Sequence, residues 1–128
     1  MGESRDISGV TVVIVEDHDD ARYMTRMALE GYGYKVLEAA DGQRAIEVAL
    51  NDRPDVILMD ISVPVIDGLT ATKRIREDAP MRETIVVALT AHYEAQYRAD
   101  ALAAGCNAYV TKPIDFDWLN GLLISLLA

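Results

Sequence analysis

Four apolar segments of the chain end in side chains that could do chemistry. These side chains are Glu16 and Asp17 after residues 10–15, Asp60 after 56–59, Thr90 after 85–89 and Lys112 after 108–111. If the segments are parallel strands, their carboxyl ends meet at one edge of a sheet, where open α/β folds place their ligands. Three carboxylates would then share one pocket, and their mutual repulsion would raise at least one pKa.

A hard divalent cation would relieve that repulsion. Mg²⁺ takes oxygen ligands in octahedral geometry and keeps several waters. We expect Asp17 and Asp60 to ligate it directly, Glu16 to act through water and the Ser62 carbonyl to add a third protein oxygen, with Mn²⁺ as the alternative ion. Helix capping and solvated turns would explain any one of these acids, but they do not explain the whole set.

A cation, a lysine and a hydroxyl at one edge suit phosphoryl transfer, in which catalysis is mostly positioning and charge stabilisation. Asp60 would be the nucleophile and would form an aspartyl phosphate. Lys112 and Thr90 would contact the other phosphoryl oxygens. Pro113 follows Lys112, and a cis bond there could aim the lysine inward; the alternative is a surface lysine at a strand end.

Strand and helix patterns alternate five times along the chain, which predicts a parallel α/β sheet with right-handed crossovers. The predicted strands are 11–15, 35–39, 55–59, 84–89 and 108–111. The predicted helices run from a cap at Asp19 or Asp20 to about 30, from 42 to about 50, from 68 to about 77, from 94 to 104, and from a cap at Asp115 to 128.

Two helices carry informative apolar residues. In the first, Tyr23, Met24, Met27 and Ala28 have helical spacing. In the last, the predicted core face consists of Phe116, Leu119, Leu122, Leu123 and Leu126. The apolar residues Trp118, Ile124 and Leu127 then lie outside that face. Such extra apolar surface suggests contact with a partner or a second copy; the alternative is that Trp118 and its neighbours fold back over the domain edge.

Composition narrows the function classes. The 128 residues fit one domain, and a net charge of −9 argues against nucleic-acid binding. No apolar stretch approaches the ~20 residues of a membrane helix, and the polar start lacks a secretion signal, so we expect a cytoplasmic protein. Cys106 is alone, so no internal disulfide forms; a packed thiol is expected, and a reactive thiol is the alternative.

Four segments together resemble the receiver domain of bacterial two-component response regulators, in its single-domain, chemotaxis-regulator-like form. They are residues 13–17 (VIVED), 58–68 (LMDISVPVIDG), 88–91 (ALTA) and 109–113 (YVTKP). The resemblance covers residues 10–127 and implies a flavodoxin-like, doubly wound five-stranded parallel sheet in the order 2-1-3-4-5 with five helices. Residues 1–9 would be an N-terminal extension, and 10–128 the receiver domain.

The resemblance also implies a phosphorelay mechanism. A histidine kinase or histidine phosphotransfer protein would phosphorylate Asp60, with Mg²⁺ held by Asp17, Asp60 and the Ser62 carbonyl and supported by Glu16. Thr90 and Tyr109 match the two switch positions, which would alter the surface of the last two helices for a downstream protein target or a homodimer. A core tyrosine packed at a sheet edge is the alternative for Tyr109.

Two variable positions of the family lie near the expected phosphate. Ser62 and His92 would tune the lifetime of the phosphorylated form, and an exposed loop histidine is the alternative for His92. His18 is expected to be an exposed loop residue beside the acids rather than a metal ligand.

Two other function classes compete with the signalling switch. A haloacid dehalogenase-type phosphatase would need an acid two residues after its nucleophile, where this chain has Ser62. A receiver look-alike that is never phosphorylated would usually lack an acid, the threonine or the lysine, and this chain keeps all of them. We therefore predict a switch that catalyses only its own phosphorylation and dephosphorylation, and not a conventional enzyme.

Overall fold

The sheet has the predicted topology. A computed structural model describes residues 7–92 and 94–128, so most of the predicted N-terminal extension lies outside the described residues. Five parallel strands pair in the order β2-β1-β3-β4-β5. The strands are β1 Thr11–Val15, β2 Lys35–Ala39, β3 Val56–Asp60, β4 Ile85–Thr90 and β5 Ala108–Thr111. The predicted flavodoxin-like arrangement is thereby confirmed.

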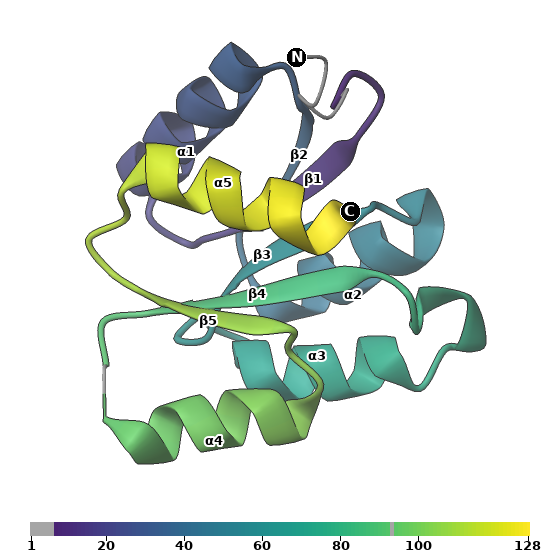
Figure 1. Ribbon diagram of the computed structural model, residues 1–128. Coiled ribbons are helices and arrows are strands. Elements are labelled where there is room, and N and C mark those ends of the chain that lie inside the picture. The colour runs from purple at the N-terminus through teal and green to yellow at the C-terminus, as the bar shows by residue number, and fades with distance from the viewer. Residues whose placement is uncertain (1–6, 93) are drawn as a thin grey trace.

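Helices cover both faces of this sheet (Figure 1). They are α1 Asp19–Tyr32, α2 Gly42–Asp52, α3 Gly68–Arg76, α4 Ala95–Ala104 and α5 Phe116–Leu127, with the short 3₁₀ helix η1 Ala79–Met81 before β4. Helices α1 and α5 pack on one face, and α2, α3 and α4 pack on the other. None of the helices in the described residues has both the length and the apolar character needed to cross a membrane.

The central strands are apolar throughout because both of their faces are buried. In β1, Val13 and Val15 join the core under α2 and α3, whereas Val12 and Ile14 join the core under α1 and α5. The same alternation holds in β3 and β4. A polar side chain at the end of such a strand is therefore held by a rigid, fully packed support.

Capping aspartates begin three of the helices. Asp41, Asp67 and Asp115 each accept a hydrogen bond from a backbone N–H three residues later, as the sequence predicted for Asp115. The prediction for α1 was wrong, because His18 occupies the N-cap, and Asp19 and Asp20 lie inside the first turn. There the two carboxylates still favour the positive end of the helix dipole.

The bounds of two strands need correction. Strands β3 and β4 each begin and end one residue later than predicted, so that Asp60 and Thr90 are the last strand residues. On α1, Tyr23, Met24 and Met27 share a face, but their exposed fractions are 61%, 63% and 52%. Helical spacing identifies a common face of a helix, but it does not show whether another element covers that face.

Helix α5 buries most of its predicted core face. Leu119 and Leu123 are fully buried, and Phe116, Leu122 and Leu126 pack against the same cluster. Leu127, predicted to be left over, also packs there. Trp118 is 58% exposed, so its indole does not fold back over the domain edge.

Helix α4 is attached to the rest of the fold mainly near its end. Its buried residues are Ala101 and Ala104. Gly105 ends the helix in a left-handed conformation at φ 110°. Arg76 of α3 donates a hydrogen bond to the Gly105 carbonyl at 3.0 Å. The first half of α4 is exposed to solvent.

Candidate functional site

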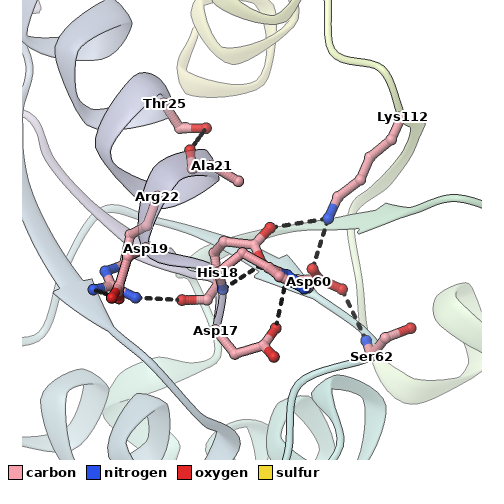
Figure 2. Close-up of polar contacts among 10 residues, drawn as sticks. Asp17, His18, Asp19, Ala21, Arg22, Thr25, Asp60, Ser62 and Lys112 are labelled. Atoms are coloured by element: carbon pink, nitrogen blue, oxygen red, sulfur yellow. Dashed lines mark hydrogen bonds and ion pairs between the residues drawn. The ribbon is translucent and has the colours of Figure 1, made fainter.

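The structure brings the predicted chemical groups to one end of the sheet. Asp60 and Thr90 end β3 and β4, while Glu16 and Lys112 directly follow β1 and β5. Figure 2 shows Lys112 reaching across to Asp60, with Asp17, His18 and Ser62 around them. This is the carboxyl edge of a parallel sheet, where ligand chemistry was expected.

Asp60 is fixed through both of its carboxylate oxygens. Oδ1 accepts the Ser62 backbone N–H at 2.9 Å, and Oδ2 accepts Lys112 Nζ at 2.6 Å. The residue is only 4% exposed. Burial raises the pKa of Asp60 above its ordinary range, although Lys112 and the Ser62 N–H favour the charged form.

Gly68 allows α3 to start close behind this carboxylate. A Cβ atom at Gly68 would lie 2.6 Å from the Asp60 carbonyl oxygen and 2.6 Å from Ile61 Cα. Backbone cannot move aside as a flexible side chain can, so a larger residue would displace the loop that carries Asp60. The same loop contains Val65, a β-branched residue at φ 71°.

Lys112 neutralises part of the acidic pocket. Its Nζ lies 2.6 Å from Asp60 Oδ2 and 2.9 Å from Glu16 Oε1. Burial alone would lower the pKa of Lys112, but the hydrogen bonds and charges of the two acids outweigh burial and raise it. The Lys112–Pro113 peptide bond is cis. Its contacts with both acids make Lys112 an inward-facing residue rather than a surface one.

Glu16 is held in its ionised form. Burial alone would raise its pKa, but the His18 backbone N–H, Lys112 and the His18 ring lower the pKa of Glu16 to about 2. Both the His18 backbone N–H and ring Nδ1 lie 3.0 Å from Glu16 Oε2. The hydrogen bond to Glu16 and the charges of Asp17 and Glu16 raise the pKa of His18 in turn.

The donor set fits a hard divalent cation. Glu16, Asp17 and Asp60 are three carboxylates, and one lysine contacts two of them, Glu16 and Asp60, so the pocket keeps an excess of negative oxygen. Asp17 has a third of its side chain exposed and is open to an arriving ion. Among the described residues, the compact group of ligand atoms within 4.8 Å of one another comprises Glu16, Asp17 and His18. His18 was not expected in this group.

Arg22 holds the loop that carries the acids, and the sequence analysis missed it. Its guanidinium donates to the Glu16 carbonyl at 2.9 Å, to Glu38 at 2.8 Å and to Asp19 at 2.7 Å. The loop after β1 is thus tied to α1 and β2 at once. A basic residue one helical turn after an acidic loop was the available signal, but its partner in β2 is evident only in the fold.

Thr90 and Tyr109 meet at the backbone of His92. Thr90 is 1% exposed, and its Oγ1 accepts the His92 N–H at 3.0 Å. The Tyr109 hydroxyl donates to the His92 carbonyl. The His92 ring stacks on Tyr97 of α4, with ring centroids 4.3 Å apart and planes 9° apart. These contacts link the end of β4 to the first turn of α4.

An apolar cavity of about 290 Å³ opens beside Lys112. Its walls include Ile14 and Leu89 from the sheet, Met24 from α1 and Phe116 from α5. A partner that approached the acids would meet this cavity and the exposed α1 face together.

Cys106 lies away from the acidic edge. It is 5% exposed, and its Sγ lies 4.0 Å from Thr72 Oγ1. Burial raises the pKa of its thiol, which agrees with the expected packed cysteine.

Comparisons with known proteins agree with this geometry. The protein-family model for the response regulator receiver domain matches residues 12–123 of this chain. The polar-differentiation response regulator DivK of Brucella anthropi is 36% identical over 104 residues, which cover 81% of this chain and 85% of that protein.

Solved structures give the same result. The chemotaxis response regulator CheY4 of Vibrio cholerae is 29% identical with a TM-score of 0.86, covering 91% of this chain and 98% of that one. The receiver domain of the sensor histidine kinase PA1611 from Pseudomonas aeruginosa is 35% identical with a TM-score of 0.86, covering 92% of this chain and 97% of that one; it is described with a magnesium ion coordinated in its active site cleft.

Proposed function

The chain belongs to the response regulator receiver domain family, and from this premise we propose that Asp60 accepts a phosphoryl group from a histidine kinase or histidine phosphotransfer protein. Members of the family are signalling switches of two-component systems. The observation that carries the proposal is the fixed Asp60 carboxylate, which has Ser62 N–H on one oxygen and Lys112 on the other.

The transfer step follows from this arrangement. One Asp60 oxygen attacks the phosphorus of a phosphohistidine, and a P–O bond forms as the P–N bond breaks. The electron pair leaves with the donor imidazole, which takes up a proton. Lys112 Nζ, already 2.6 Å from the Asp60 oxygen, remains close enough to contact the transferred group and balance its charge.

A bound Mg²⁺ would supply further positive charge to a phosphoryl oxygen. Asp17, Asp60 and the Ser62 carbonyl would hold it, with Glu16 in support. Before the ion arrives, Lys112 keeps Glu16 and Asp60 from repelling each other. Arg22 keeps the Glu16 backbone in place.

The switch would start from Thr90. When the Thr90 hydroxyl turns to a phosphoryl oxygen, it can no longer accept the His92 N–H, and the bond from Tyr109 to the His92 carbonyl is disturbed with it. The Tyr109 ring then turns inward. Because His92 stacks on Tyr97, this change reaches α4. Ser62 and His92 would tune the lifetime of the phosphorylated form.

Two surfaces would serve partners. The phosphodonor protein must present its histidine to Asp60, and the exposed α1 residues Tyr23, Met24 and Met27 with the adjoining cavity give it an apolar docking face. The downstream target, or a second copy, would engage the surface formed by α4, β5 and α5, including exposed Trp118. We assign residues 10–128 to the receiver domain and 1–9 to an N-terminal extension.

The test is phosphorylation by a small donor. Acetyl phosphate with Mg²⁺ should add one phosphoryl group to the protein by intact mass. The Asp60→Ala variant should gain none, whereas Asp52→Ala, at the exposed end of α2, should behave as the unmodified chain does. A chelator should stop the reaction. Labelling that persists in Asp60→Ala, or without any divalent cation, would contradict the assignment.

A further inference from the structure

His18 stands at the rim of the acidic pocket and points its ring toward the acids. Its side chain is 78% exposed. Although it occupies the N-cap of α1, it makes no capping bond. Instead, Nδ1 lies 3.0 Å from Glu16 Oε2 and 3.4 Å from Asp17 Oδ1 (Figure 2).

These separations match those of ligands that share one metal ion. Adjacent ligands of an octahedral ion at about 2.1 Å lie roughly 3.0 Å apart, and ligands of a tetrahedral ion at about 2.0 Å lie roughly 3.3 Å apart. The hydrogen-bond distance of 3.0 Å from His18 Nδ1 to Glu16 equals the octahedral value, and the 3.4 Å to Asp17 is close to the tetrahedral one, so a small side-chain adjustment would bring both to a single geometry. The third distance of this triangle of ligand atoms joins oxygens of Glu16 and Asp17 and is within 4.8 Å. A side-chain rotation of the exposed Asp17 would shorten it.

One corner of this triangle is already rigid. Glu16 has a 7% exposed side chain, and Lys112 fixes its other oxygen, Oε1, at 2.9 Å. Arg22 holds the Glu16 carbonyl. An ion that entered here would therefore meet one fixed oxygen, Oε2, and two adjustable ligands from exposed side chains.

The type of donor atom decides which ion the site binds most tightly. Mg²⁺ prefers oxygen, whereas imidazole nitrogen favours first-row transition ions, most strongly those late in the series, and Zn²⁺. We propose that His18 is a nitrogen ligand through which Glu16, Asp17 and His18 hold a divalent transition ion, with Zn²⁺ preferred over Mn²⁺, in competition with Mg²⁺. The competition rests on the proposed function, because Asp17 would serve both ions.

The two modes of binding would differ in their use of Asp60. Mg²⁺ would take Asp17 together with Asp60, whereas the transition ion would take Asp17 with Glu16 and His18 and leave Asp60 with Lys112. A site filled in the second way would lack the cation where a phosphoryl oxygen needs it. Zn²⁺ would then act as an inhibitor of the switch.

The test is direct ion binding. Calorimetric titrations with ZnCl₂, MnCl₂ and MgCl₂ compare the unmodified chain, His18→Ala and His92→Ala, which removes the other histidine of the chain. We expect His18→Ala to weaken Zn²⁺ binding by about 10-fold or more and Mn²⁺ binding less, since loss of a supporting group at a metal site typically lowers affinity by about 10–100-fold. Mg²⁺ affinity should change less than about two-fold, on the ligand preferences above.

A second measurement reports the bond itself. On addition of Zn²⁺, the ring ¹⁵N resonances of His18 should show a coordinated Nδ1 with the proton on Nε2, and excess Mg²⁺ should reverse the change. Zn²⁺ affinity that is equal in the unmodified chain and His18→Ala, or that is lost in His92→Ala, would overturn the inference. Unaltered Mg²⁺ binding in Asp17→Asn would instead count against the cation site of the proposed function.

Discussion

Lys112 is the counter-charge of the acidic pocket, so its removal should be felt in stability as well as in signalling. In Lys112→Ala, Glu16 and Asp60 lose their ammonium partner although their side chains are only 7% and 5% exposed. Breaking a buried ion pair by removing one partner is costly because the other charge stays in a poorly solvated place. We therefore expect a clear loss of folding stability near neutral pH.

The pKa of Glu16 gives the size of the effect. Its fall from 4.5 to about 2 corresponds to about 3–4 kcal/mol, at about 1.4 kcal/mol per pKa unit. Lys112 shares this stabilisation with the hydrogen bonds from His18, and it also contacts Asp60, so a large part of it is lost with the lysine. The expected loss is about 2–3 kcal/mol, or a Tm lower by about 10 °C for a domain of this size.

The sign of the pH dependence follows from the same shifts. A carboxylate with a lowered folded pKa contributes stability above its unfolded pKa, and that contribution is lost as the pH falls. For Glu16 the window runs from 4.5 down to about 2. The raised pKa of Asp60 acts the other way, because its charged form is disfavoured by burial at neutral pH. Without Lys112, the charged carboxylates of Glu16 and Asp60 are both less stable in the folded protein at pH 7. In acid the two carboxylates bind protons, so the loss of the lysine then costs less stability.

Thermal unfolding in a chelating buffer at pH 7 and pH 4 tests these values. The penalty of Lys112→Ala should be largest at pH 7 and smaller at pH 4. Lys73→Ala, on the exposed surface of α3, is the control and should shift stability by less than about 0.5 kcal/mol. Added Mg²⁺ should stabilise Lys112→Ala more than the unmodified chain. An unchanged Tm at pH 7, or a penalty that does not shrink in acid, would refute the reasoning.

Three further variants probe the loops of the site. Arg22→Ala should weaken Mg²⁺ binding by about 10-fold in calorimetry, because the Glu16 loop loses its tie, whereas Arg44→Ala on α2 should not. Val65→Asn should raise the free energy of unfolding by about 1 kcal/mol in denaturant titrations, because asparagine tolerates a positive φ better than a β-branched residue does; a destabilised variant would show that φ 71° is not strained. Gly68→Ala should lower the free energy of unfolding by about 1–3 kcal/mol, since its Cβ would overlap backbone at 2.6 Å, and an unchanged midpoint would contradict that overlap.

Much of the fold could be predicted because local signals agreed with one another. The all-apolar strands could only be central parallel strands, and Asp115 and Gly105 mark the helix ends that the structure has. The packing of α1 could not be predicted in this way. Tyr23, Met24 and Met27 face solvent, and the short residue Thr25 lies inside with Leu29, because the neighbouring sheet and α5 decide which face of α1 is covered.

The residues of the site also fall into two groups, those that the sequence predicts and those that it does not. The ends of strands identify Asp60, Thr90 and Lys112, because the topology alone brings them to one edge. The parts played by Arg22 and His18 depend on side-chain directions across β2 and the first turn of α1, and a linear pattern does not contain these. Expectation and structure therefore differ most where two elements meet through long side chains.

Helix α4 has a consequence for how such a chain can diversify. Because its anchorage comes from Ala101, Ala104 and the Gly105 carbonyl held by Arg76, the outward residues of its first half, apart from Tyr97, which stacks on His92, are nearly free of folding constraints. Substitutions there can alter which target recognises the chain at little cost in stability. Duplicated copies could thus acquire separate pathways, and avoid cross-talk between them, by changing this one strip of surface while the acidic pocket stays the same.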